Sequence, residues 1–438
     1  MNKKIVFLIC LTMNTIVFSE VKKESLFNGI TFIHNYNSNQ PIVSIIIFLK
    51  MGEIYEPKEY EGISELLQSV IIKGTKNRTA EQIAEEVESL GGTISADANE
   101  DFSTLSIAVG SRHFDKALEI LSDVFKNPIF PKNEIEKEKI NIIASILSRK
   151  DKIFDVAIDE LLYNLYGKKH PYGRKPIKAI RIIKKITQKD LFNWWSKFYG
   201  IDRNKNNIVI VISGDVEYNF AKETVLKYFS DIPKITLPDI VCYPVKIKNR
   251  YIKKKTHFKQ GYLMYGYISP SLSRDNLSNY LPLKLINTYL GGGMSGKLFE
   301  HLREQHSLCY ETNSFYPSRY LDSHFVIYLG LDYERVSIAK NEIEKILNQI
   351  VDGGLLTEEE LKEVKRKIKG RYLLDHQTNS QQAWYLGFWE IIGLGCEYDE
   401  LYLKDLEKIS LEEIRDIAKK VFSSPRTVVE LVPKRKTK

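Results

Sequence analysis

The stretch of residues 52–75, GEIYEPKEYEGISELLQSVIIKGT, joins two kinds of sequence pattern. Before it, the β-branched run Ile42–Leu49 predicts a buried strand. Inside it, residues 62–73 predict a helix, and after it residues 92–98 and 103–109 predict two more strands. A strand, a helix and two further strands in this order are typical of an α+β domain, in which helices cover a sheet.

This order of elements occurs twice along the chain. The first half has further elements expected at residues 31–34, 113–125, 188–198, 207–213 and 220–229, and a long helical stretch from Pro131 to about Tyr166. The second half has strands expected at residues 262–268, 310–316, 323–331 and 427–431, and helices at 279–290, 295–303, 336–351, 357–376 and 411–422. We therefore predict an α+β fold of two similarly built domains, each a mostly antiparallel sheet covered by helices.

Composition divides the chain into four parts. Residues 1–19 are expected to form a signal peptide, residues 20–236 the first domain, residues 237–256 a linker and residues 257–438 the second domain. The linker contains prolines and a basic run, residues 246–255, with six Lys or Arg and no acid. A solvated linker face explains this run better than a binding patch.

Overall composition excludes some classes of protein. The chain has 438 residues, of which 43% are hydrophobic and 27% charged, as in globular proteins and unlike disordered chains. The 64 Lys and Arg against 56 Asp and Glu leave a net charge of +8 that is scattered along the sequence. This excess favours acidic partners or membrane surfaces, but it does not indicate nucleic-acid binding.

The N-terminus has the pattern of an export signal. Lys3 and Lys4 precede the apolar residues 5–18, and Ser19 ends a small-residue cleavage site. Polar residues interrupt the apolar run, so it is a poor membrane span, and the run before Cys10 is too short for a lipidation signal. We expect a periplasmic or secreted protein, with association to a membrane surface and an uncleaved N-terminal anchor as open alternatives.

Three cysteines follow the signal segment: Cys242, Cys309 and Cys396. Three widely spaced cysteines do not form a disulfide framework. No C-x-x-C pair indicates a zinc knuckle. One disulfide with one free thiol stays open as an interpretation.

Three motifs in register along the chain carry a resemblance to a known family. The first is the stretch of residues 52–75, which ends in Lys-Gly-Thr. The second is LGGGMSGKLF at residues 290–299, followed by LRE at 302–304 and LCY at 308–310. The third and weaker motif is HPYGR at residues 170–174. Together they resemble the pitrilysin and mitochondrial-processing-peptidase family of zinc metallopeptidases, the inverzincins, which implies two similar domains that enclose a chamber for an extended peptide.

The resemblance breaks at the zinc-binding helix. Active members of this family carry H-x-x-E-H there, because two histidines four apart on one helix face bind Zn²⁺ and the glutamate acts as general base. By alignment on the resemblance, the two histidine positions are Glu65 and Ser69, and the base position is Gln68, which cannot take a proton. The third ligand of the family, a glutamate two turns after another glutamate, falls on Ser145 when Glu138 is taken as the earlier one. All three ligands and the base are therefore changed.

The eight histidines of the chain offer no evident replacement. No two of them are three or four residues apart. His301 and His306 are five apart, which places them on different faces of an α-helix. We therefore expect no cofactor in this chain, and zinc in a partner subunit.

Two residues of the second motif match the family's substrate-facing pair, Arg303 and Tyr310. In the family this pair faces the zinc across the chamber, where an Arg binds a peptide carbonyl and a Tyr hydroxyl donates to the developing oxyanion. Without the resemblance, a surface ion pair and a packed strand residue would be the better explanation of these two residues. The family has Gly where Ser307 stands, so the turn that aims Tyr310 is expected to differ.

The resemblance also implies substrate-binding segments. Gly291, Gly292 and Gly293 lack the context of a phosphate loop and are expected to form a flexible turn beside the chamber. Ser95 and Ala96 match an edge strand along which an extended peptide adds as a further strand. An ordinary edge strand is the equally simple interpretation.

Three hypotheses follow for function. In the first, the chain is the non-catalytic subunit of a heteromeric processing peptidase and pairs with a homologous, zinc-bearing chain. In the second, it is an inert peptide-binding or scaffold module. In the third, it is an autonomous peptidase with an unusual site. A neighbouring gene for a similar chain with an intact H-x-x-E-H motif would favour the first.

Overall fold

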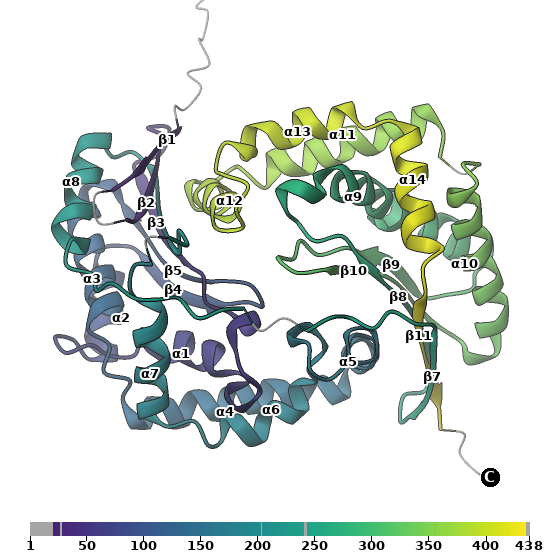
Figure 1. Cartoon of the computed structure of the whole chain (residues 1–438), viewed down its shortest axis with the longest axis horizontal. Helices are drawn as coiled ribbons and strands as arrows, with labels where there is room; N and C mark the ends of the chain where they lie inside the picture. Colours follow the sequence, from purple (N-terminus) through teal and green to yellow (C-terminus); the bar gives the residue numbers. More distant parts are fainter. Residues whose placement is uncertain (1–20, 27–28, 203, 241–242, 355, 435–438) are drawn as a thin grey trace, which may run out of the picture.

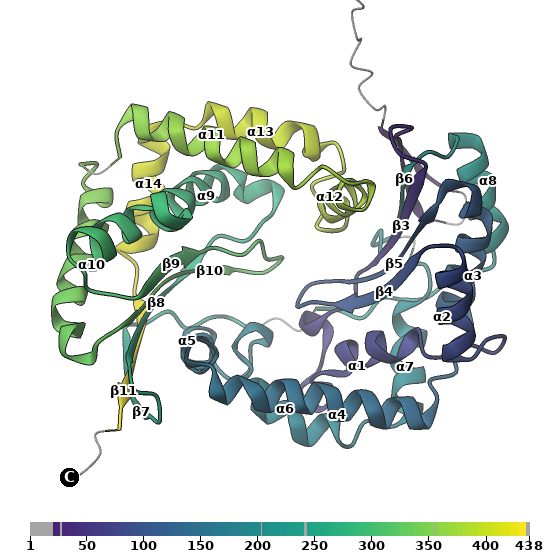
Figure 2. The same ribbon diagram turned by 180° about the vertical axis from the view of Figure 1, so that it is seen from behind.

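The structure is a computed structural model that describes residues 21–26, 29–202, 204–240, 243–354 and 356–434. In these residues, two halves of α+β architecture face each other across a central space, and each half has a sheet with helices packed against it (Figures 1 and 2). The prediction of two similarly built domains is confirmed. The expected signal peptide and Cys242 lie outside the described residues.

The first sheet has six strands in the order β1-β2-β6-β3-β5-β4. Their bounds are β1 Val21–Ser25, β2 Thr31–Tyr36, β3 Ile42–Leu49, β4 Thr93–Ala98, β5 Ser103–Gly110 and β6 Ile208–Gly214. Only β2 and β6 pair in parallel, and the remaining neighbours are antiparallel. The apolar runs of β3 and β6 lie at the centre and are buried almost throughout, as such runs require.

The second sheet repeats this topology with five strands in the order β7-β11-β8-β10-β9. Their bounds are β7 Arg250–Thr256, β8 Gly261–Ser269, β9 Glu311–Phe315, β10 Ser323–Leu331 and β11 Arg426–Pro433. Here β7 and β11 are the parallel pair, as β2 and β6 are in the first sheet. Strand for strand, the second sheet therefore matches the first without β1.

The helices follow the same repeated order. In the first half they are α1 Ile63–Ile71, α2 Ala80–Ser89, α3 Phe114–Lys126, α4 Lys132–Ser148, α5 Ile153–Tyr166, α6 Pro176–Ile183, α7 Gln188–Phe198 and α8 Tyr218–Phe229. In the second half they are α9 Leu277–Gly291, α10 Val336–Val351, α11 Glu358–Leu374, α12 Asn379–Ile391, α13 Tyr398–Lys408 and α14 Leu411–Phe422. Capping boxes begin five of them, at Thr79, Thr187, Thr357, Thr378 and Ser410.

Several sequence-based boundaries differ from the structure. The long helix expected from Pro131 to Tyr166 is divided by a 3₁₀ turn at Arg149–Asp151 into α4 and α5. The strand β7 lies in the segment that was assigned to the linker, because its partner β11 is at the far end of the chain and gives no local signal. The elements β1, α2, α6, α12 and α13 were not anticipated. The expected short helix after the glycines is a π-helix at Phe299–Gln305.

One helix of each half packs on the sheet of the other half. Helix α5 of the first half packs on the second sheet, where the side chain of Leu161 lies over Gly266 and a Cβ on that glycine would come within 2.8 Å. Helix α12 of the second half packs on β3 and β6 of the first sheet, where Gly387 meets the ring of Phe48. In each case a glycine permits the close approach. The first sheet and its covering helices therefore include a helix from the second half of the sequence, and the second sheet is covered in part by a helix from the first half.

Two further findings concern the membrane and the thiols. Among the described residues, none of the helices combines the length and apolar character that crossing a bilayer requires. Cys309 and Cys396 are both buried free thiols. Burial raises the pKa of Cys309 to about 11 and that of Cys396 to about 12, so both stay protonated at neutral pH.

Candidate functional site

Helix α1 carries the changed zinc motif, and its first residues are hydrogen-bonded to Glu56. Gly62 adopts a φ of 89°, which favours glycine, and its N–H donates to the Glu56 carboxylate at 2.8 Å. The N–H of Ser64 donates to the other oxygen of Glu56 at 2.9 Å. Arg174, from the HPYGR motif, donates to the carbonyl of Glu56 at 2.7 Å. Two of the three motifs therefore meet at the start of α1.

The side chains at the motif positions of α1 are bonded within the chain or exposed. Gln68 is buried, and its amide oxygen accepts from the Tyr199 hydroxyl at 2.9 Å. Ser69 donates to the carbonyl of Glu65, one turn earlier in the same helix, at 2.9 Å. Glu65 is exposed, but the surrounding protein reduces its solvation and, with the charge of Glu56, raises the pKa of its carboxyl.

The third ligand position lies on α4, which packs against α1. Ser145 is exposed there, and its carbonyl accepts from the Ser148 hydroxyl at 2.8 Å. Glu138 forms an ion pair with Lys73 at 3.4 Å and accepts from Asn141 at 3.1 Å. Of the three ligand positions only Glu65 offers a usual zinc ligand. The hydroxyls of Ser69 and Ser145 do not fit a zinc ion, which prefers imidazole, thiolate and carboxylate ligands.

The Arg303 side chain of the second half is left accessible. It projects from the π-helix Phe299–Gln305, and its guanidinium lies over the ring of Phe299 at 4.9 Å. Within the described part of the chain, no carboxylate forms an ion pair with Arg303, and the residue is exposed. The surface ion pair that would explain this residue without a function is therefore absent there.

Tyr310 follows the π-helix after a tight turn. Ser307 adopts a φ of 50°, the left-handed conformation that a glycine takes without strain. Tyr310 is 54% exposed, and its hydroxyl donates to Asp332 at 2.6 Å. This hydrogen bond raises the pKa of Tyr310, so the hydroxyl keeps its proton at neutral pH.

A cavity of about 1060 Å³ opens between the halves. Gly291, Gly292 and Gly293 line it, as does Arg319. From the first half the β4–β5 turn lines it, and from the second half an aromatic wall lines it, made of Tyr280, Trp384, Phe388, Trp389 and Tyr402. Arg303, Tyr310, Ser95 and Ala96 are not among its lining residues. The candidate residues are therefore divided between this cavity and two other surfaces.

Lys284 on α9 gives the cavity a cationic group. Its ammonium donates to the carbonyl of Tyr316 at 2.7 Å and lies within 5.2 Å of the rings of Tyr280 and Tyr316. Burial, with a smaller effect from the charge of Arg319, lowers the pKa of Lys284 to about 8. An aromatic wall with such a group suits an apolar or aromatic side chain next to a carboxylate or carbonyl.

Backbone geometry and close packing also explain why glycines stand at this edge of the cavity. Gly291 ends α9 against the backbone of Ser314 in β9, where a Cβ would clash. Gly293 adopts a φ of 79°. Lys367 donates to the carbonyl of Gly292 and to the Ser295 hydroxyl. Lys367 therefore ties this turn to α11, and the flexibility expected from the sequence stays a prediction.

The edge strand β4 carries Ser95 and Ala96. It ends the first sheet and pairs only with β5 among the described strands. The Ser95 and Ser106 hydroxyls are hydrogen-bonded at 2.8 Å. The free edge of β4 has the geometry to receive an added strand.

A polar junction that sequence patterns did not reveal joins the halves. The Tyr172 hydroxyl, in the HPYGR motif, donates to Asp101, and Arg319 from the β9–β10 turn pairs with Glu100. The backbone N–H of Tyr320 donates to Asp101 at 3.1 Å. Burial raises the pKa of Asp101 to about 6, although the charge of Arg319 opposes this. The Tyr172 hydroxyl also accepts from the backbone N–H of Leu321 at 3.3 Å, so the third motif takes part in the contact between the halves.

Comparisons with known proteins agree with this architecture. Residues 31–176 match the family description "Insulinase (Peptidase family M16)", and residues 185–368 match "Peptidase M16 inactive domain". The chain belongs to peptidase family M16. The resemblance to the pitrilysin and mitochondrial-processing-peptidase family is confirmed.

Individual M16 relatives span nearly the whole chain. An uncharacterized zinc protease of Rickettsia felis is 27% identical over 410 residues, which are 93% of this chain and 96% of the relative. The "Non-peptidase homolog YmxG" of Helicobacter pylori is 23% identical over 396 residues, 88% of each chain. The crystal structure of a peptidase M16 inactive domain from Pseudomonas fluorescens superposes with a TM-score of 0.86 over 95% of this chain and 99% of its own, at 21% identity. At that identity the likeness shows the fold alone.

Proposed function

We propose that this chain is the non-catalytic subunit of a heteromeric M16 peptidase. A homologous partner with an intact H-x-x-E-H helix supplies the zinc ion and the general base. This chain contributes Arg303, which binds a carbonyl of the peptide, and Tyr310, which donates to the oxyanion as the scissile carbonyl is attacked. Both residues act in trans, in the partner's site.

The observation that carries this proposal is that side chains of the second motif are exposed, whereas two of the changed zinc motif are hydrogen-bonded within the chain. Arg303 and Tyr310 are exposed, and Arg303 has no carboxylate partner in the described residues. In the changed motif, by contrast, Gln68 at the base position and Ser69 at a ligand position are hydrogen-bonded within their own half. A chain that has kept its oxyanion-stabilising groups and lost its metal ligands needs a second chain for hydrolysis.

Asp332 has a defined part in this proposal. Without substrate it accepts the Tyr310 hydroxyl, and the raised pKa keeps that hydroxyl protonated. An oxyanion close to Tyr310 competes with Asp332 for the same proton. The hydroxyl is thereby held ready as a donor and is not released as phenolate.

The substrate is proposed to be an extended peptide. The free edge of β4, with Ser95 and Ala96, can add it as a further strand. The cavity lined by Gly291, Gly292 and Gly293 can take one apolar or aromatic side chain against its aromatic wall, near the Lys284 ammonium. The N-terminal pattern of residues 1–19 supports export, so the complex is expected in the periplasm or outside the cell.

A second candidate function is an inert peptide-binding or scaffold module. The same cavity and free strand edge support it, because both need no zinc. The two functions differ in what Tyr310 does, since a scaffold has no oxyanion to stabilise.

Turnover by the reconstituted complex distinguishes the two functions. The zinc-bearing partner is kept fixed and this subunit is varied. Tyr310→Phe removes one oxyanion donor and is expected to lower kcat about 100- to 1000-fold, roughly 2.7–4 kcal/mol. Arg303→Ala is expected to raise KM as well, because an Arg binds the carbonyl in the ground state too.

The matched control is Tyr320→Phe, because Tyr320 is also exposed and lies in the second half. Its hydroxyl has no part in the proposal, and its variant should keep turnover within about threefold, the effect of an ordinary surface change. Size-exclusion chromatography confirms that each variant assembles. Unchanged turnover for Tyr310→Phe in an assembled complex removes the shared site and leaves the scaffold function.

A further inference from the structure

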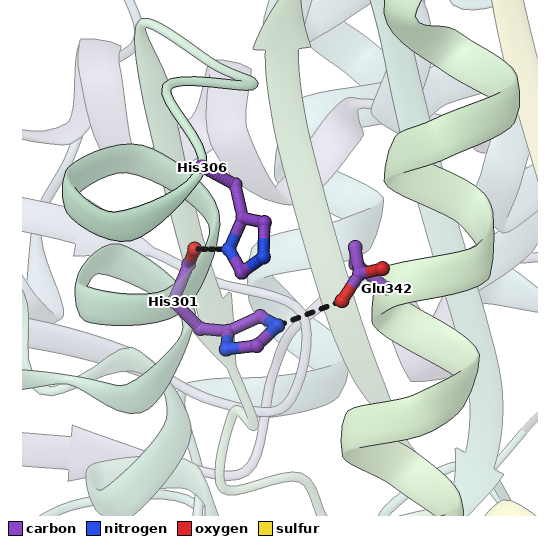
Figure 3. Close-up of side chains that lie close together, drawn as sticks. All are labelled: His301, His306 and Glu342. Carbon is purple, nitrogen blue, oxygen red and sulfur yellow. Dashed lines mark hydrogen bonds and ion pairs between the residues drawn. The ribbon is translucent and has the colours of Figure 1, made fainter.

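Three metal-ligating side chains of the second half meet at a place that is separate from the positions of the family's zinc motif. His301 lies on the π-helix Phe299–Gln305, His306 follows it directly, and Glu342 lies on α10 (Figure 3). Their ligand atoms all lie within 4.8 Å of one another. None of the three lines the cavity between the halves.

The π-helix brings His301 and His306 together, although their spacing of five residues predicted that they lie on different helix faces. In an α-helix, residues five apart are separated by about 140° around the axis. In a π-helix the hydrogen bonds connect residues five apart, so such residues lie one turn above each other on the same side. His301 and His306 accordingly face each other, with ring centroids 4.5 Å apart.

Hydrogen bonds to the chain direct the ligand atoms toward one point. The carbonyl of His301 accepts from Nδ1–H of His306 at 2.8 Å, which leaves Nε2 of His306 with a free lone pair. A backbone carbonyl on the second ring nitrogen is the usual partner that orients a metal-bound histidine. Nε2 of His301 lies 2.8 Å from Oε2 of Glu342, and Lys345 holds Oε1 of Glu342 at 2.6 Å.

We propose that Nε2 of His301, Nε2 of His306 and Oε2 of Glu342 bind one Zn²⁺ ion. Two imidazoles and one carboxylate are a usual zinc ligand set, with water in the fourth position. Ligand atoms around a tetrahedral zinc ion lie roughly 3.3 Å apart. The His301–Glu342 pair therefore opens by about 0.5 Å, and the proton that these two groups share leaves to solvent as the ion enters.

The ion would have a structural effect on the segment that carries Arg303. His301 and His306 bracket Arg303 in the chain, and Glu342 belongs to a different helix. Zinc would fasten the π-helix to α10 and hold the turn that leads to Tyr310. This role does not depend on the proposed function, because it concerns the order of one segment and not hydrolysis.

Metal titration of the purified chain tests the site. The protein is treated with a chelator, dialysed and titrated with Zn²⁺ in a calorimeter. The wild type is expected to bind one ion per chain. His306→Gln is expected to weaken this binding at least about 10-fold, because loss of a direct ligand costs no less than loss of a residue that orients one. His306 is exposed, so this variant should fold as the wild type does, which far-ultraviolet circular dichroism checks.

The matched control is His257→Gln, since His257 is exposed and lies away from the cluster. It should bind Zn²⁺ as the wild type does. Substitution with Co²⁺ adds a second readout, because a tetrahedral site gives an intense visible spectrum that should disappear in His306→Gln and persist in His257→Gln. No Zn²⁺ binding by the wild type, or equal binding by His306→Gln, overturns the proposal.

Discussion

Helix α1 and the π-helix Phe299–Gln305 carry the two most specific motifs of the chain, but their polar side chains differ in availability. In α1, Gln68 is buried and accepts from Tyr199, and Ser69 bonds to its own helix. In the π-helix, Arg303 is exposed and stacks on Phe299. The difference shows that residues at the changed motif positions of α1 are hydrogen-bonded within their own half, whereas Arg303 in the second half is left accessible.

The largest expected effect is the gain of zinc binding at α1 when all the metal ligands of the family are restored there. Glu65→His, Gln68→Glu and Ser69→His together should not create a zinc site, because Ser145 still leaves the third ligand missing. Addition of Ser145→Glu is expected to give one further zinc ion per chain. The measurement is zinc content after chelation and reloading, in a His306→Gln background that removes the proposed second site. Zinc binding at α1 by the triple variant would show that the chain supplies a third ligand from elsewhere.

Loss of the junction between the halves should be the largest effect on stability. Arg319→Met leaves Glu100 and Asp101 without their cation and is expected to lower the free energy of unfolding by about 3 kcal/mol. The control is Arg371→Met, whose ion pair with Asp375 is on the surface, and it should cost less than about 0.5 kcal/mol. Urea unfolding measures both. Equal effects of the two variants would mean that solvent screens the ion pair at the junction as fully as it screens a surface ion pair.

The packing of α12 on the first sheet can be tested by two glycines in helix interiors. Gly387→Ala on α12 forces a Cβ against Phe48 of the first sheet and should cost about 1–3 kcal/mol. Gly370→Ala on α11 has nothing within 4 Å and should stabilise by about 0.5–1 kcal/mol, as alanine usually does in a helix. Thermal and urea unfolding give both free energies. If Gly387→Ala also stabilises, α12 does not pack on the first sheet in solution.

The smallest expected effect concerns the turn before Tyr310. Ser307→Gly relieves a left-handed serine and should stabilise the protein by about 0.5–1 kcal/mol. Ser423→Gly, at a helix end with a φ of −86°, should instead destabilise by about 0.5–1 kcal/mol. Opposite signs in urea unfolding support the turn geometry, and a loss of stability in both variants contradicts it.

Sequence patterns predicted the parts of the fold that depend on local periodicity. The apolar run of β3 and the amphipathic α14 were placed at their observed bounds, because burial of one face imposes a regular spacing. The strand β7 was missed because three of its seven residues are consecutive lysines, its inward residues are mostly only partly buried, and its pairing partner β11 is distant in sequence. The packing of α5 and α12 on the opposite sheets was equally invisible, since it depends on tertiary contacts.

The candidate site was predicted only where a motif marked it. Arg303 and Tyr310 were found through the resemblance, and their action in trans stays a prediction. The junction of Asp101, Tyr172 and Arg319 joins distant segments and has no local pattern. The prediction that His301 and His306 lie on different helix faces was wrong, because 3.6 residues per turn do not hold in a segment that forms a π-helix.

The central claim is that this chain contributes to hydrolysis through its second half and not through α1. Two substitutions compared in one complex test it most directly: Tyr310→Phe and Gln68→Ala, each assembled with the same zinc-bearing partner and assayed for peptide turnover below the unfolding temperature of both variants. We expect a roughly 100- to 1000-fold loss of kcat for Tyr310→Phe and a kcat within about threefold of the wild type for Gln68→Ala. A large loss for Gln68→Ala with unchanged turnover for Tyr310→Phe would contradict it.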